Sequence, residues 1–313
     1  MAQARAHGQD QHLSIRRDRG FHSGDCCRLS DLLVGKRKLC VGRVMQKVMV
    51  MIPTHCAPKV VMMTLGTWLE TYDQSYRAEV LLGVHQNYLD YHPGLPELEA
   101  LPHVRIAKVK EISWASIDRT PNPWDCVLRY SQMHALNIIN LMKVVMGSDF
   151  THVSVLDHDL VFRKDFVKWC LNQPVDLVGC YQADRSEEHR ALSGWGVLRY
   201  QPKFSVWHMV LSAELYAKTM LQPELVEPAV RGDMFYDTFS RVVEKARGEW
   251  GCRVMVLSSA DIENWVKHSW SMSFNFGMKQ VGPPEYWKRM AEYEAEYDKR
   301  FPKGINHLLE KLA

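Results

Sequence analysis

Two carboxylates stand two residues apart in the segment 155–162, whose sequence is VLDHDLVF. Asp157 and Asp159 directly follow the apolar run 152–156, which is typical of a buried strand. Two like charges in such a place cost several kcal/mol unless something compensates them. A divalent cation such as Mg²⁺ or Mn²⁺ accepts hard oxygen ligands and binds phosphate oxygens at the same time. Because Asp is also common in exposed turns, the position after an apolar strand, more than the D-x-D spacing itself, favours a metal site.

The elements that must position these carboxylates alternate along the chain. Apolar runs ended by turn residues predict strands, and apolar residues at helical spacing predict helices between them. The predicted strands are 47–52, 79–84, 103–108, 152–156, 176–180 and 252–257, and the predicted helices include 58–70, 125–146 and 285–297. In the second helix Asp125 is the expected N-cap and Gly147 the expected stop. Strands that alternate with helices predict a mostly parallel sheet covered by helices, hence an α/β fold.

Composition and charge bound the class of protein. The chain has 313 residues, 46% hydrophobic and 24% charged, which excludes a largely disordered protein. The sequence has no apolar run of membrane-spanning length and does not begin like a secretory signal. Eight cysteines, without a CxxC pair, are typical of free thiols in a reducing compartment. We therefore expect a cytoplasmic protein without a transmembrane segment.

The charge is unevenly distributed. Residues 1–45 carry nine basic and four acidic side chains, whereas the rest of the chain carries 30 basic and 32 acidic ones. We interpret 1–45 as a flexible basic extension, with an over-long translated start or an anion-binding arm as alternatives. The slightly acidic remainder lacks the general charge of a nucleic-acid binder. Residues 46–280 are expected to form the main domain, followed by a helical tail at 281–313.

The order of several motifs carries a family resemblance. An apolar strand ending in Pro-Thr (48–54) precedes a Leu-rich helix segment with small residues (65–70), a second strand (79–84) and the D-x-D, which lies 103 positions after Thr54. In this order, residues 46–275 resemble nucleotide-sugar glycosyltransferases of the GT-A fold, particularly the family 2 type. The resemblance implies a Rossmann-like sandwich in one main domain, with a nucleotide-binding half at 46–160 and an acceptor half at 161–280.

The resemblance also implies roles for individual residues. The nucleotide sugar would contact Pro53, Thr54, His55, Asn87, Arg129 and Asp157. Asn87 belongs to a His-Gln-Asn run that stands where the family usually has an acidic residue reading uracil, so the identity of the base is left open. Arg129 would contact the diphosphate, and the alternative is that it is an ordinary solvent-exposed arginine on a helix.

The metal, the base and the acceptor side are assigned by the same resemblance. Asp159, Asp157 and His268 would hold the cation, and the imidazole favours Mn²⁺ over Mg²⁺. Asp237, with Asp233 as second choice, matches the family's general base, although Asp near a helix N-terminus is also explained by capping. Trp195 and Trp207 would stack on a ring of the acceptor or lie in the core.

These roles together predict a metal-dependent glycosyltransferase of hexosyltransferase type. It would move a sugar from a nucleotide sugar, a UDP-sugar first, to an acceptor hydroxyl with inversion. The acceptor would be a saccharide or another soluble hydroxyl compound, with a hydroxylated DNA base as a further option.

Two alternatives stay open. Residues 157–161 also fit the D-x-D-x-V of haloacid-dehalogenase-like phosphatases, with Asp233 and Asp237 as their late acidic motif. In those phosphatases the D-x-D-x-V normally lies near the start of the domain, whereas here it comes about 110 residues after the first predicted strand. Their late acidic motif should follow an apolar strand, and the residues before Asp233, 227–231, are not an apolar run. The second alternative is a non-catalytic module that binds nucleotide sugars.

Overall fold

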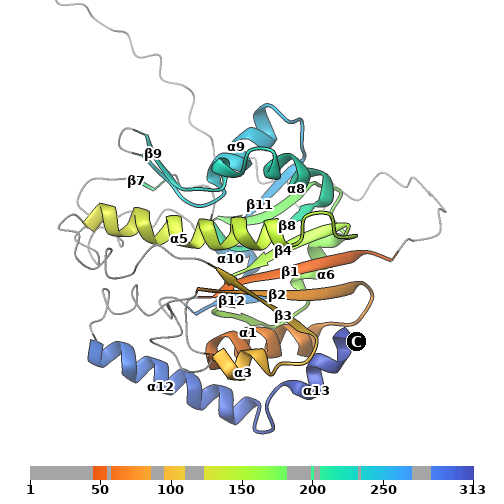
Figure 1. Ribbon diagram of the computed structural model, residues 1–313, viewed down its shortest axis with the longest axis vertical. Helices are drawn as coiled ribbons and strands as arrows, with labels where there is room; N and C mark the ends of the chain where they lie inside the picture. Colours follow the sequence, from red (N-terminus) through yellow and green to blue (C-terminus); the bar gives the residue numbers. More distant parts are fainter. Residues whose placement is uncertain are drawn as a thin grey trace, which may run out of the picture. The chain divides into compact units, whose positions relative to one another are not determined.

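A seven-stranded sheet forms the centre of the protein (Figure 1). The computed structural model describes residues 45–54, 58–85, 95–109, 123–181, 199–200, 205–231, 234–269 and 283–313. The strands of the sheet are β1 (Lys47–Thr54), β2 (Arg77–His85), β3 (Val104–Val109), β4 (His152–Leu156), β6 (Leu177–Tyr181), β8 (Ser205–Ser212) and β11 (Val254–Ser258). They follow the spatial order β11-β6-β8-β4-β1-β2-β3.

All neighbouring strands of this sheet run parallel except around β8, which is antiparallel to both β4 and β6. The predicted mostly parallel α/β sheet is therefore confirmed. Strand β8 is not among the predicted strands. Its insertion places Leu156, the last residue before the D-x-D, opposite His208.

Helices cover both faces of the sheet, which is the usual condition for parallel strands. One face carries α1 (Pro58–Thr71), α3 (Leu95–Glu99), α6 (Phe166–Leu171), α10 (Ser259–Ile262), α12 (Pro283–Arg300) and α13 (Asn306–Leu309). The other face carries α5 (Pro123–Val144), α8 (Ala213–Met220) and α9 (Ser240–Gly248).

Strand β1 shows how one run of apolar residues serves two cores. Val48, Val50 and Ile52 point into the core under α1, whereas Met49 and Met51 point into the core under α5. This alternation is the period of two that every strand imposes on its side chains. A continuous apolar run is thus the pattern expected of a central strand with helices on both sides.

Short strands and turns complete the described elements. β5 (Leu160–Phe162) pairs antiparallel with β12 (Val266–His268). β10 (Met234–Tyr236) lies between β7 (Arg199–Tyr200) and β9 (Ala229–Arg231) in a three-stranded sheet. The 3-10 helices η2 (Pro223–Leu225) and η3 (Glu310–Leu312) are the remaining elements.

Helix α5 begins earlier than its sequence indicates. It starts at Pro123, so Asp125 lies inside the first turn and the expected N-cap role is wrong. Proline fits the first helical position because it needs no N–H partner there. The expected stop is found, since Gly147 follows the helix with a φ of 82°.

None of the helices in the described ranges combines the length and the apolar character that a membrane crossing requires.

Candidate functional site

The D-x-D forms the turn between β4 and β5. β4 ends at Leu156, and the chain enters β5 at Leu160. Asp157 and Asp159 thus leave the carboxyl end of a central parallel strand, where open α/β sheets bind their ligands. His158, between them, is buried and its Nδ1 lies 3.2 Å from the Pro53 carbonyl oxygen, which ties the turn to the end of β1.

His268 reaches the D-x-D through the pairing of β12 with β5. In this pairing His268 lies opposite Leu160, and the Ser269 N–H donates a hydrogen bond of 2.9 Å to the Asp159 carbonyl. The His268 Nε2 atom is 3.3 Å from Asp157 Oδ2 and 3.1 Å from Asp159 Oδ1. One ligand atom from each of the three residues lies within 4.8 Å of the other two.

This donor set fits a divalent cation. Two carboxylates supply the hard oxygen ligands preferred by Mg²⁺ and Mn²⁺, and an imidazole suits the transition metal better. The structure thus brings together the three residues that the sequence analysis selects as metal ligands.

The charges within the cluster balance one another. Burial opposes ionisation of Asp157, but a hydrogen bond from His268 and the neighbouring histidine charges hold the pKa of Asp157 well below its usual range. Burial would likewise lower the pKa of His268, but the charge of Asp159 and the hydrogen bonds to both carboxylates raise it to about 10. Without a bound cation, an imidazolium at His268 supplies the positive charge that two adjacent carboxylates require. Because only the neutral imidazole is a metal ligand, a bound cation would take the place of this proton.

Asp237 lies between β10 and α9, close enough to the D-x-D for the Asp157 charge to act on it. Burial and that charge raise the pKa of Asp237, against hydrogen bonds from the Thr238 N–H and the Ser131 side chain. The N-cap of α9 is Phe239, which makes no side-chain cap bond. Among the described residues, the Asp237 carboxylate bonds its neighbour Thr238 at 2.8 Å and does not cap the helix.

Helix α5 contributes two residues to this region that the sequence analysis does not select. Ser131 bonds Asp237 through its side chain and accepts a hydrogen bond of 3.1 Å from the Thr238 hydroxyl at its carbonyl. One turn further, His134 has its pKa lowered by burial, against the charges of Asp157 and Asp237. Polar residues three positions apart on a helix with an apolar face are the signal that could have revealed them.

The other predicted site residues have different outcomes. Pro53 and Thr54 end β1 next to the D-x-D turn, and Thr54 is buried. Arg129 lies on α5 and Trp207 on β8. His55, Asn87, Trp195 and Asp233 lie outside the described residues.

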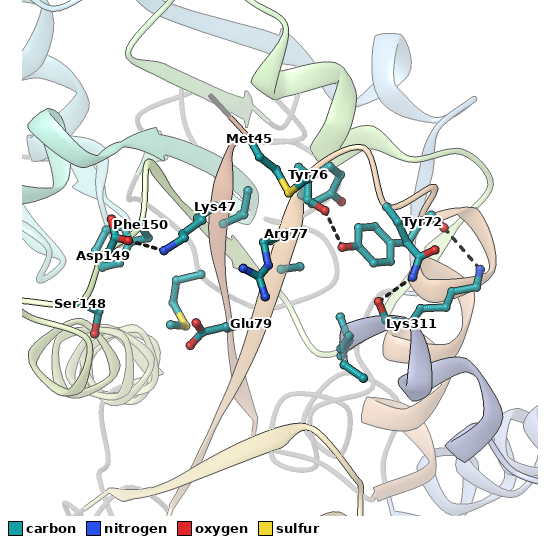
Figure 2. Close-up of a pocket in the computed structure, with 16 residues that line it drawn as sticks. Met45, Lys47, Tyr72, Tyr76, Arg77, Glu79, Ser148, Asp149, Phe150 and Lys311 are labelled. Carbon is teal, nitrogen blue, oxygen red and sulfur yellow. Dashed lines mark hydrogen bonds and ion pairs between the residues drawn. The ribbon is translucent and has the colours of Figure 1, made fainter. Parts of the chain in front are cut away.

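A pocket of about 430 Å³ lies beside the first residues of β1 and β2, at the opposite ends of these strands from the D-x-D. Figure 2 shows the residues that line it. Lys47 pairs there with Asp149. Lys311 donates to the carbonyls of Leu69 and Tyr72 at 2.7 and 3.3 Å and so closes the end of α1. Because these two cations already serve the fold, we place the candidate site at the D-x-D.

Comparison with known proteins finds likenesses of backbone only. No protein-family model and no curated sequence matches the chain. Glucosyl-3-phosphoglycerate synthase from Mycobacterium tuberculosis, solved with Mn²⁺, UDP and phosphoglyceric acid, is similar with a TM-score of 0.39, 12% identity and 68% of each chain covered. A mannosyltransferase from Pyrobaculum calidifontis, solved with GDP-Man and Mn²⁺, is similar with a TM-score of 0.37, 16% identity, and 86% of this chain and 74% of that chain covered.

A third similar structure is the inositol-1-phosphate CTP transferase from T. maritima. Its TM-score is 0.39 at 11% identity, with 82% of this chain and 97% of that chain covered. Identities and TM-scores this low do not assign a function to this chain.

Proposed function

We propose that this protein is a metal-dependent glycosyltransferase of hexosyltransferase type, using a nucleotide-sugar donor. The observation that carries the proposal is the cluster of Asp157, Asp159 and His268 at the carboxyl edge of the sheet, with the partly buried Asp237 carboxylate near enough to feel the charge of Asp157. Asp157, Asp159 and His268 would hold Mn²⁺ or Mg²⁺. When bound, the cation supplies a Lewis acid that neutralises the diphosphate leaving group.

Asp237 is the proposed general base. Its carboxylate accepts the proton of the acceptor hydroxyl while the oxygen attacks the anomeric carbon and the bond to the diphosphate breaks, which inverts that centre. Burial raises the pKa of Asp237 and so makes it a stronger base than an exposed carboxylate. The Ser131 and Thr238 bonds hold it in place, because they fix the carboxylate from two directions. Asp233 is the second choice for this role.

The nucleotide would lie along the ends of β1 and β2. Pro53, Thr54 and His55 are proposed to contact base and ribose, Asn87 the base, and Arg129 the diphosphate. Trp195 and Trp207 are proposed on the acceptor side. We propose a UDP-sugar as donor and a soluble hydroxyl compound, such as a saccharide, as acceptor.

A screen of the purified protein tests the proposal. Thermal stability and hydrolysis would be measured with UDP-, GDP- and dTDP-sugars, with CTP, and with p-nitrophenyl phosphate, each with and without Mn²⁺. Stabilisation by one nucleotide-sugar series, dependent on Mn²⁺ and accompanied by slow sugar release, supports the proposal and names the base.

Two other results of the screen contradict the proposed reaction. Mg²⁺-dependent hydrolysis of the phosphomonoester without a response to nucleotides indicates the phosphatase alternative. Binding of nucleotide sugars without turnover, both in the screen and with a panel of saccharide acceptors, indicates the non-catalytic module.

A further inference from the structure

Two threonines of helix α1 form hydrogen bonds with the backbone of the D-x-D turn and of β5, the strand that follows it. Thr64 and Thr67 are both fully buried and lie three residues apart, which places them on one face of the helix. The face packs against the turn and β5, which are far from α1 in the sequence. Neither residue belongs to the site assigned above.

The Thr64 hydroxyl binds the backbone on both sides of Asp159. Its oxygen lies 2.6 Å from the His158 carbonyl, 2.9 Å from the Leu160 carbonyl and 3.0 Å from the Leu160 nitrogen. The hydroxyl accepts the Leu160 N–H, and its single proton is shared between the two carbonyls, of which the His158 carbonyl is the nearer. A threonine inside a helix commonly bonds the carbonyl four residues earlier, whereas all of these Thr64 contacts go to the turn.

Thr67 binds the backbone of β5 in a similar way, two residues further along the chain than Thr64 does. It accepts the Phe162 N–H at 3.1 Å and donates to the Met63 carbonyl of its own helix at 2.9 Å. The threonine pair thus fixes both the turn and the strand β5, which in turn carries β12 and His268.

The backbone around Asp159, one of the proposed metal ligands, is consequently held by contacts from several parts of the chain. Thr64 holds residues 158 and 160, Ser269 holds the Asp159 carbonyl, and the His158 ring contacts the Pro53 carbonyl. With its backbone fixed in this way, Asp159 has only side-chain torsions left to adjust. A ligand whose position is set in advance binds a metal more tightly than one that must be ordered on binding.

We propose that Thr64, assisted by Thr67, is a positioning residue that sets the affinity of the Asp157–Asp159–His268 cluster for a divalent cation; this rests on the metal role proposed above. Valine has the shape of threonine without its hydrogen bonds. Thr64→Val therefore removes the three backbone contacts and leaves the packing of α1 in place.

Binding of Mn²⁺ alone, followed by the electron paramagnetic resonance signal of the free ion, tests this without any substrate. We expect Thr64→Val to weaken Mn²⁺ binding at least about tenfold and Thr67→Val by a smaller factor. Thr64→Ser keeps the hydroxyl and is expected to bind within about threefold of the wild type.

Thr219→Val is the matched control. Thr219 is equally buried in a helix, but within the described part of the chain its hydroxyl bonds the Leu215 carbonyl of its own helix α8, at 2.8 Å, and no residue of the D-x-D turn. We expect it to bind Mn²⁺ like the wild type. Circular dichroism and thermal melts establish that each variant is folded.

The outcomes separate this proposal from the proposed function. A folded Thr64→Val protein with wild-type affinity overturns the positioning role, and so does a Thr64→Ser protein as weak as the valine variant. If Thr64→Val does not fold, wild-type affinity in Thr67→Val overturns it. Failure of the wild type itself to bind Mn²⁺ overturns the metal role and this proposal with it.

Discussion

Asp159 is the more enclosed of the two D-x-D carboxylates, with 4% of its side chain exposed against 21% for Asp157. If this cluster binds the metal, Asp159→Ala removes a ligand that solvent cannot easily replace. We expect it to lower metal-dependent turnover by about 100-fold or more, because the diphosphate charge loses its counter-ion. Turnover of the donor found in the screen, together with Mn²⁺ titration, measures the effect.

Asp149→Ala provides the comparison for this change. Asp149 has 86% of its side chain exposed and lies at the other ends of the strands, where it pairs with Lys47. Turnover in Asp149→Ala should stay near that of the wild type. Wild-type-like turnover in Asp159→Ala would discard the metal role of Asp159.

Asp237 permits a separate test of the proton transfer. Asp237→Asn keeps the shape of the side chain but cannot accept a proton from the acceptor. We expect turnover to the acceptor to fall by about 10²- to 10⁴-fold, with Mn²⁺ and donor binding maintained. Single-turnover kinetics and donor titration separate the two effects. Loss of donor binding together with turnover would instead indicate that Asp237 helps to hold the donor.

At the scale of elements, Gly66 lets the C-terminal part of the chain approach α1. A Cβ at this position would lie 2.7 Å from Phe301 Cζ and 2.8 Å from Ile305 Cγ2. We expect Gly66→Ala to lower the free energy of unfolding by about 1–3 kcal/mol, because the Phe301 ring and the Ile305 side chain must move. Urea denaturation measures the change.

Gly248→Ala is the control for the glycine change, since a Cβ there meets nothing within 4 Å. It should be neutral or stabilise the protein by up to about 1 kcal/mol. An equal effect at both glycines would show that the contact with residues 301 and 305 is not the cause.

The sequence predicts the elements whose pattern is local. The β1 and α1 segments were recognisable because a full apolar run and a helical period are visible within single windows. The β5–β12 pairing and β8 were not, because these strands depend on partners far along the chain and two of them are only three residues long.

The same distinction applies to the candidate site. Asp157, Asp159 and His268 could be selected because motif order and residue type identify them as candidate ligands. Thr64, Ser131 and His134 could not, because their roles depend on which backbone lies opposite a helix face. Nothing in a single window indicates that neighbour.

At the scale of the whole molecule, Asp165 makes stability depend on pH. Its carboxylate caps α6 through the Lys168 N–H and accepts a hydrogen bond from Tyr76, yet burial raises its pKa from 3.8 to about 6. The folded protein therefore binds this proton more tightly than the unfolded chain does. The resulting stabilisation is complete below the unfolded pKa and is lost as the pH rises through about 6.

Asp165→Asn keeps the cap oxygen and removes the ionisation. Relative to the wild type, we expect its free energy of unfolding to gain about 2 kcal/mol between pH 4 and pH 7.5, allowing for the partial exposure of the group. Denaturation curves at both pH values measure it. Parallel pH profiles for the two proteins would show that Asp165 titrates normally in the folded state.

Helix α1 lies between the site and the last part of the chain. Its apolar residues share a core with Tyr297, Phe301 and Ile305, while Thr64 and Thr67 face the D-x-D turn. During synthesis α1 leaves the ribosome well over 200 residues before those partners. Until they arrive, the nascent chain exposes an apolar surface that chaperones bind and that promotes aggregation. The support that α1 gives to the D-x-D turn would therefore be complete only after residues 297–305 have left the ribosome and packed against the helix.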